Sequence, residues 1–188
     1  MSVATAGDVN GDGYSDVIIG AYRYSEVLSV QEGRAFVYYG SATGLSATPD
    51  STPDDADQAG AGFGRSVACA GDVNGDGYSD VIIGAYFYSE VVNIQEGRAF
   101  VYYGSAAGLS ATPDSILDDA NQANCYFGTT VSSAGDINAD GYCDVIVGSP
   151  QYDEGANDNE GRAFVYYGSA AGLSATPGST LSDGNQVY

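Results

Sequence analysis

Short apolar stretches alternate with polar, glycine-rich stretches along the whole chain of 188 residues. Two apolar runs near the middle are Val81–Ala85, "VIIGA", and Arg98–Gly104, "RAFVYYG". Apolar runs of this length, bounded by turn residues, are typical of buried strands, and branched and aromatic residues favour strands over helices. No long stretch has the 3.6-residue periodicity of an amphipathic helix. The pattern therefore predicts an all-β protein.

The whole pattern repeats with a period of 64 residues. Copies of "GRAFVYYGSA" begin at Gly33, Gly97 and Gly161. The pair Phe-Gly stands at Phe63-Gly64 and again one period later, at Phe127-Gly128. A self-similar period of this length is the signature of a repeat architecture in which each repeat is one supersecondary unit.

Each period contains four candidate strands, which in the middle copy are Gly64–Gly71, Val81–Ala85, Arg98–Gly104 and a weak, polar outer strand near Asp114–Asp118. The first strand is rich in small residues, which suits the crowded centre of a ring. Four antiparallel strands in about 60 residues, repeated in tandem, describe a propeller blade. We therefore expect one array of three four-stranded β-propeller blades, at residues 1–64, 65–128 and 129–188.

Three blades are fewer than the four to eight that usually close a propeller. The first copy also lacks the Phe-Gly pair that opens the other two. We therefore expect an incomplete ring, completed either by the rest of a longer array or by a head-to-tail homo-oligomer. Two chains would supply six blades, and a contact that does not close would give a filament.

The formal net charge is −20, with five arginines and no lysine or histidine. This charge would repel nucleic acid and anionic membranes, so neither is an expected partner. It also opposes a compact fold unless bound cations neutralise part of it. The N-terminus "MSVATAGDVN" has no signal-peptide features, and no apolar run is long enough to span a membrane.

The candidate cation sites are three copies of one acidic loop, "GDVNGDGYSD", "GDVNGDGYSD" and "GDINADGYCD". Calcium prefers six to eight oxygen ligands, and alternate side chains of a tight loop can direct their oxygens at one centre. We expect about one Ca²⁺ per repeat, three per chain, with ligands at loop positions one, three, five, seven (a backbone carbonyl) and nine. These residues are Asp8, Asn10, Asp12, Tyr14 and Asp16; Asp72, Asn74, Asp76, Tyr78 and Asp80; and Asp136, Asn138, Asp140, Tyr142 and Asp144.

Asp, Asn and Gly are also ordinary turn formers, so one copy alone would not predict a metal. The loop is not an EF-hand, because position twelve, where an EF-hand needs a bidentate Glu, is Ile19, Ile83 or Val147. Three copies that all keep the acidic positions favour the calcium interpretation.

Together, Phe63-Gly64, "SVACAGDVNGDGYSDVIIGA" and "GRAFVYYG" closely resemble the FG-GAP repeat of the integrin α-subunit propeller and its bacterial relatives. The resemblance covers the whole chain. It implies a β-propeller, usually of seven blades, with calcium in the loop between the first two strands of a blade. The Gly-Ala-Pro of that family is replaced here by Gly20-Ala21-Tyr22, Gly84-Ala85-Tyr86 and Gly148-Ser149-Pro150.

No catalytic site is expected. The chain has no histidine for general-base catalysis and no lysine for a Schiff base. The acidic pairs Asp54-Asp55 and Asp118-Asp119 are expected to be solvated turns. The odd number of cysteines (Cys69, Cys125 and Cys143) favours small free thiols over a disulfide framework.

We therefore expect a non-catalytic, calcium-binding propeller module, used outside the cell or at its surface for adhesion, protein interaction or assembly. Two alternatives remain open. One is a lectin-like propeller that binds glycans near Tyr22, Tyr86 and the tyrosine pairs Tyr38-Tyr39, Tyr102-Tyr103 and Tyr166-Tyr167. The other is an accessory domain of a secreted hydrolase.

Overall fold

The computed structural model describes residues 1–25, 31–54, 58–90, 94–118, 122–153 and 159–182. Every regular element in these ranges is a β-strand, which confirms the predicted all-β class. The strands are β1 (Ser2–Gly7), β2 (Asp16–Gly20), β3 (Ala35–Tyr38), β4 (Phe63–Gly71), β5 (Asp80–Ala85), β6 (Arg98–Tyr102), β7 (Ser115–Leu117), β8 (Thr130–Gly135), β9 (Asp144–Ser149), β10 (Arg162–Tyr166) and β11 (Ser179–Leu181).

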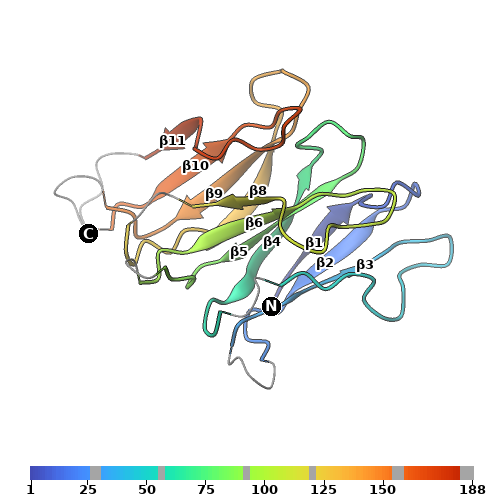
Figure 1. Cartoon of the computed structure of the whole chain (residues 1–188), viewed down its shortest axis with the longest axis horizontal. Helices are drawn as coiled ribbons and strands as arrows, with labels where there is room; N and C mark the ends of the chain where they lie inside the picture. Colours follow the sequence, from blue (N-terminus) through green and yellow to red (C-terminus); the bar gives the residue numbers. More distant parts are fainter. Residues whose placement is uncertain (26–30, 55–57, 91–93, 119–121, 154–158, 183–188) are drawn as a thin grey trace.

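The strands form three antiparallel sheets that follow one another along the chain (Figure 1). The first sheet is β1-β2-β3, the second is β4-β5-β6-β7, and the third is β8-β9-β10-β11. Each sheet is an up-and-down meander, as expected for a propeller blade. The three sheets do not close a ring.

The first sheet differs from the other two at its outer edge. Where the others have a fourth strand, it has only an isolated bridge between Val37 and Ser51. Pro53 stands at the position of Leu117 in β7, and its carbonyl accepts the Ala35 N–H. Proline has no N–H to donate to a strand ladder, which explains why this edge is shorter.

The Phe-Gly pair joins each sheet to the one before it. β4 begins at Phe63, so the expected boundary after Gly64 falls inside a strand of the second sheet. The Phe63 N–H donates to the Glu32 carbonyl of the preceding repeat at 2.9 Å, and Phe127 does the same to Glu96 at 2.8 Å. The pair is therefore a connector between neighbouring sheets.

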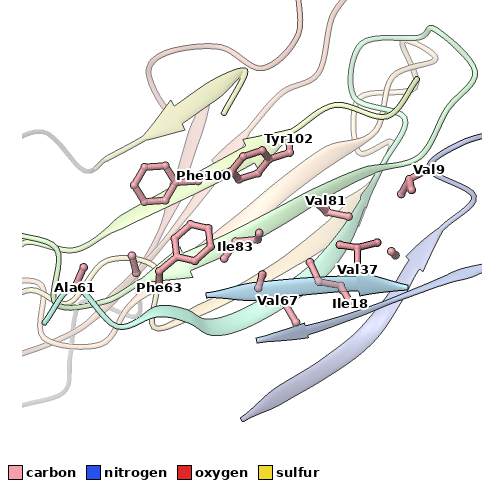
Figure 2. Packing of buried hydrophobic residues seen from close by; sticks show 13 residues of the cluster. Val9, Ile18, Val37, Ala61, Phe63, Val67, Val81, Ile83, Phe100 and Tyr102 are labelled. Atoms are coloured by element: carbon pink, nitrogen blue, oxygen red, sulfur yellow. The ribbon is translucent and has the colours of Figure 1, made fainter. Parts of the chain in front are cut away.

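Two apolar cores lie between the sheets. The first holds Val9, Ile18 and Val37 from one side and Phe63 and Ile83 from the other (Figure 2). The second repeats this arrangement one period later, between the second and third sheets. Strands of the middle sheet are buried on both faces, which is why their sequences are continuously apolar rather than alternating.

Glycines allow the sheets to approach closely at these interfaces. A Cβ on Gly20 would overlap the Gly64 carbonyl of the next sheet, and Gly84 meets Gly128 in the same way. The glycine of Gly-Ala in one sheet thus packs against the glycine of Phe-Gly in the next sheet. The close approach of the two backbones gives a steric reason for the glycine in both motifs.

The outer faces of the two end sheets remain open. Val3 of β1 is 67 % exposed, whereas its counterparts Val67 and Val131 are only 6 % and 7 % exposed. At the other end of the chain Ile137, in the acidic loop between β8 and β9, is 54 % exposed, and its counterparts Val9 and Val73 are fully buried. The two open faces therefore correspond to the two sides of the interface that joins neighbouring sheets, which the chain forms twice.

Candidate metal loops

Each acidic loop connects the first and second strands of a sheet. In the first sheet it leaves β1 at Gly7 and enters β2 at Asp16, and the strand register shifts between Thr5 and Gly7. The same irregularity precedes the second and third loops. The strands thus hold the ends of each loop at a fixed separation.

The first aspartate of each loop organises the backbone around itself. Asp8 Oδ1 accepts the N–H groups of Gly11 and Asp12 at 2.7 and 3.1 Å, and Oδ2 accepts that of Gly13 at 2.8 Å. Asp12 Oδ1 in turn accepts the Tyr14 N–H at 2.9 Å. These bonds to ionised acceptors fold the loop tightly over its own carboxylates.

The other two loops repeat this geometry. The N–H groups of Gly77 and Gly141 donate to Asp72 and Asp136, each at 2.9 Å. Within each loop the asparagine amide donates to the second oxygen of the central aspartate, at 3.1, 3.0 and 2.8 Å for Asn10, Asn74 and Asn138. Positions one, three and five are therefore brought together in all three copies.

The aspartate at position nine has a different environment, because Asp16, Asp80 and Asp144 are all fully buried. Asp80 Oδ2 accepts the Val73 N–H and Oδ1 accepts the Gly104 N–H, both at 2.9 Å. This residue therefore ties the loop to the connection that follows the third strand. The other two copies make the equivalent bonds.

Burial raises the pKa of Asp80 to about 7, because water no longer solvates the charged form. The bonds from Val73 and Gly104 act in the opposite direction, and the nearby charges of Asp76 and Asp72 raise the pKa further. Burial is also the main cause of the raised pKa of Asp16. The carboxylates within one loop therefore repel one another. A bound cation would balance their charge.

Neighbouring loops lie side by side. The Ser79 N–H donates to the Asp8 carbonyl at 3.0 Å, and the Cys143 N–H donates to the Asp72 carbonyl at 2.9 Å. The Tyr78 ring packs on Gly11 of the preceding loop, where a Cβ would lie 2.6 Å from ring atom Cε1. The three loops form a connected row at one end of the sheets.

The chemistry of this donor set fits calcium, since every candidate ligand atom is a hard oxygen and a carboxylate oxygen can serve more than one partner. Asp8, Asp12 and their counterparts would hold the ion together with the buried aspartates. In the part of the chain that the structure describes, however, no three acidic, cysteine or histidine side chains meet closely enough to hold a metal. The fifteen ligand assignments therefore stay predictions.

Other sequence-level candidates have structural roles. Tyr102 and Tyr166 are fully buried, and their hydroxyls donate to the carbonyls of Asp54 and Asp118 at 2.6 and 2.7 Å. One tyrosine of each of these two pairs is therefore core, whereas Tyr38 and Tyr39 are both half-buried. Asp118 pairs with Arg98, while Asp55 and Asp119 lie outside the described residues. None of the three cysteines forms a disulfide, as predicted.

Each of the three repeats matches a known protein family. The family model described as "FG-GAP repeat" matches residues 1–38, 63–102 and 127–166. The chain belongs to the FG-GAP repeat family. Each match runs from the first to the third strand of one sheet, and therefore contains one acidic loop together with the strands that hold it.

Relatives of the FG-GAP chain include integrin α-subunits and an enzyme. Integrin alpha pat-2 of Caenorhabditis elegans is 30 % identical over 98 % of the chain, and human integrin alpha-7 is 33 % identical over 79 %. Bovine phosphatidylinositol-glycan-specific phospholipase D is 30 % identical over 87 %. The chain spans only 15 %, 12 % and 20 % of these three relatives. The described residues include no helix long and apolar enough to cross a membrane.

Proposed function

We propose that this FG-GAP chain is a non-catalytic, calcium-binding β-propeller module that serves adhesion, protein interaction or assembly outside the cell or at its surface. The observation that carries the proposal is the threefold recurrence of one acidic loop, in which the glycine N–H at position six donates to the aspartate at position one each time. The similarity to integrin α-subunits supports the same conclusion.

Bound calcium would supply positive charge at the acidic row and cross-link the oxygens of each loop. Extracellular calcium is millimolar, which would saturate even sites with dissociation constants of roughly 10⁻⁴–10⁻³ M. An ion that binds only the folded chain stabilises it by mass action. We therefore expect the charge of −20 to be partly neutralised in the working protein.

Thermal unfolding in excess calcium and in excess chelator tests this proposal. Calcium is expected to raise Tm clearly, and magnesium at the same concentration is expected to do so less, because its octahedral preference fits a flexible oxygen loop poorly. Titration calorimetry should give about three ions per chain, one for each loop. Equal Tm values with calcium and with chelator would refute the proposal.

We also propose that the open end faces bind each other between two copies of the chain, head to tail. The residues of the two faces correspond: Val3 stands at the position of buried Val67, and Ile137 stands at the position of buried Val9. Each open face therefore carries one half of an interface that the chain already forms twice. Apolar surface of this kind is stabilised by burial.

The phospholipase D relative supports a second candidate, an accessory propeller domain of a secreted hydrolase. The chain has no histidine or lysine, so the catalytic residues of such an enzyme would lie in another part of it. A hydrolase assay on this chain alone is expected to show no activity.

A further inference from the structure

In the second and third repeats the phenylalanine of the Phe-Gly pair packs against aromatic rings of its own sheet. The centroid of the Phe63 ring lies 5.5 Å from that of Phe100 and 6.4 Å from that of Tyr102 (Figure 2). Phe127 lies 5.4 and 6.3 Å from the corresponding two rings of the third sheet. Both phenylalanines are fully buried in the core that each sheet shares with the sheet before it.

The first sheet has the same aromatic rings without the phenylalanine that covers them. Among the described residues Tyr24 is the only ring beside Phe36, at 5.7 Å. Phe36 is half-buried, whereas its counterparts Phe100 and Phe164 are each 3 % exposed. Tyr38 is likewise half-buried, whereas its counterparts in the other two sheets are fully buried. Solvent therefore reaches rings that are enclosed in the other repeats.

An apolar row and a hollow adjoin these rings. Val3 pairs across the strands with Ile19, and Ile19 pairs with Phe36, so the three side chains share one face of the first sheet. A hollow of about 270 Å³ is lined by Met1, Ala21, Tyr22, Arg23 and Tyr24. The Tyr24 ring, which lies edge-on against Phe36, joins the hollow to the row. Val3, Ile19, Phe36, Tyr38 and this hollow together form the open socket of the first sheet.

In the other repeats the backbone that leads into the Phe-Gly pair lies at the position of this hollow. The Phe87 N–H donates to the Ala61 carbonyl at 3.0 Å, and the Gln151 N–H donates to the Cys125 carbonyl at 3.3 Å. Each acceptor is two residues before the phenylalanine of the pair. The counterpart of these two donors in the first repeat is the Arg23 N–H, which has no acceptor among the described residues. The open socket thus offers a backbone donor as well as an apolar surface.

We propose that the open socket binds a Phe-Gly segment of a partner chain that itself carries FG-GAP repeats. The phenylalanine ring packs on Phe36, where its burial and edge-on ring contact stabilise the complex. The Arg23 N–H donates to the carbonyl two residues before that ring. The inference rests on the proposal that the end faces are interaction surfaces, and it names the partner of one of them.

A second copy of this chain does not supply the segment. It has two Phe-Gly pairs, and their phenylalanines, Phe63 and Phe127, are fully buried in its own sheets. The glycine of the segment has a conformational role, since Gly64 and Gly128 have φ values of 79° and 80°, which glycine adopts without strain. The partner is therefore recognised by a large ring followed by a residue that can take a positive φ.

NMR titration of the Leu181→Asp chain with a short peptide tests the proposal. Leu181 is 57 % exposed on the third sheet, and a charge there should keep a second copy from covering the first sheet. The probe is the acetylated and amidated peptide "QAGAGFG", the sequence of residues 58–64, and the control peptide has alanine in place of the phenylalanine. The probe should shift the signals of Phe36 and Val3 with a Kd of about 1 mM, because a flexible peptide loses conformational freedom on binding. Equal binding of both peptides, or of neither, would overturn the proposal.

Two further substitutions in the Leu181→Asp chain locate the binding. Val3→Asp should weaken binding of the probe about tenfold or more, because it places a charge in the open socket. Val3 is 67 % exposed, so the fold should persist. Ile116→Asp places the same charge on β7 of the middle sheet and should leave the Kd unchanged. Probe binding that Val3→Asp does not weaken would show that the peptide binds elsewhere.

Attaching the segment to the chain gives a second measurement, because tethering raises its effective concentration at the socket. Met1 stands at the position of Arg65, so the Leu181→Asp chain is extended before Met1 by "AGFG", the sequence of residues 61–64. This extension should raise Tm by about 2–4 °C relative to "AGAG", since the bound ring stabilises the first sheet. Equal Tm values for the two extensions would overturn the socket. Calcium stoichiometry and the sedimentation of the unmodified chain are measured separately, so failure of either proposal above is distinguishable from failure of this one.

Discussion

The Tyr142 ring of the third loop lies directly over Gly75 of the second, so that a Cβ on Gly75 would lie 2.6 Å from ring atom Cε1. Tyr78 has the same relationship to Gly11 one repeat earlier. The glycine at loop position four therefore has two reasons to be a glycine. It has a positive φ, and it accommodates an aromatic ring from the next sheet.

Gly75→Ala separates these two reasons when it is compared with Gly77→Ala. Both glycines have a positive φ, 77° and 91°, but a Cβ on Gly77 would meet nothing within 4 Å. Gly77→Ala is expected to cost the backbone strain alone, about 1–2 kcal/mol. Gly75→Ala should cost a further ~1–3 kcal/mol of overpacking against Tyr142. Urea unfolding measures both, and equal losses would show that the ring moves away freely.

Ala139→Gly is expected to stabilise the chain. Ala139 occupies the position of Gly75 in the third loop and has a φ of 59°, a conformation that is strained for alanine. Glycine removes the strain but adds entropy to the unfolded state, so the net gain should be about 0.5–1 kcal/mol. Ala106, an exposed residue without a positive φ, provides the control. Ala106→Gly should have the opposite sign, and a loss of stability in both variants would contradict the strain at Ala139.

Asp76→Asn should remove one calcium ion and leave two. Asp76 is exposed, and its Oδ1 accepts the Tyr78 N–H at 3.0 Å, a bond that an asparagine oxygen can still accept. The fold should therefore persist while the hard, charged ligand is lost. Calorimetry would give a stoichiometry of about two instead of about three.

Asp114→Asn is the matched control for this variant. Asp114 lies outside the loops, and its Oδ2 accepts the Tyr103 N–H at 2.8 Å. It should keep the full stoichiometry. If Asp76→Asn also kept it, the second loop would not be a calcium site of the predicted kind.

Val3→Asp and Leu181→Asp each should abolish head-to-tail association, because each places a charge in one half of the proposed interface. Leu181 is 57 % exposed, whereas its counterpart Leu117 is fully buried between the second and third sheets. Sedimentation velocity on the unmodified chain in calcium should give the mass of two chains. Each variant alone should sediment as one chain. A mixture of the two variants should recover the double mass, since one unmodified pair of faces remains between them.

The control for association is Ile116→Asp, which places the same charge on the outer strand β7, where Ile116 is 47 % exposed. It should associate like the unmodified chain. A single-chain mass for the unmodified protein at high concentration would contradict the proposed self-association. Failure of the mixture to associate would show that the two faces do not recognise each other.

Much of the fold follows from the sequence because the signals are local. The apolar runs at Val81–Ala85 and Arg98–Gly104 predicted β5 and β6 to within two residues at each end. The repeat pattern predicts a fourth strand in the first sheet as well, whereas that edge holds only the bridge between Val37 and Ser51, followed by Pro53. That residue lacks the N–H group a strand needs there.

The site was predictable to a lesser degree. The spacing of Asp8, Asn10 and Asp12 indicated one compact loop, and the structure brings these residues together. The full burial of Asp16, Asp80 and Asp144 could not be read from the pattern, because it depends on bonds from residues 24 positions further along the chain.

The middle sheet belongs to both apolar cores, whereas each end sheet belongs to only one. Opening either end sheet therefore exposes one core, while opening the middle sheet exposes both. In such an array local unfolding begins at the ends at lower cost and reaches the centre last. Amide protons of β5 should accordingly exchange with solvent more slowly than those of β2 or β9. Any partner that covers an end face would slow exchange throughout the sheet it caps.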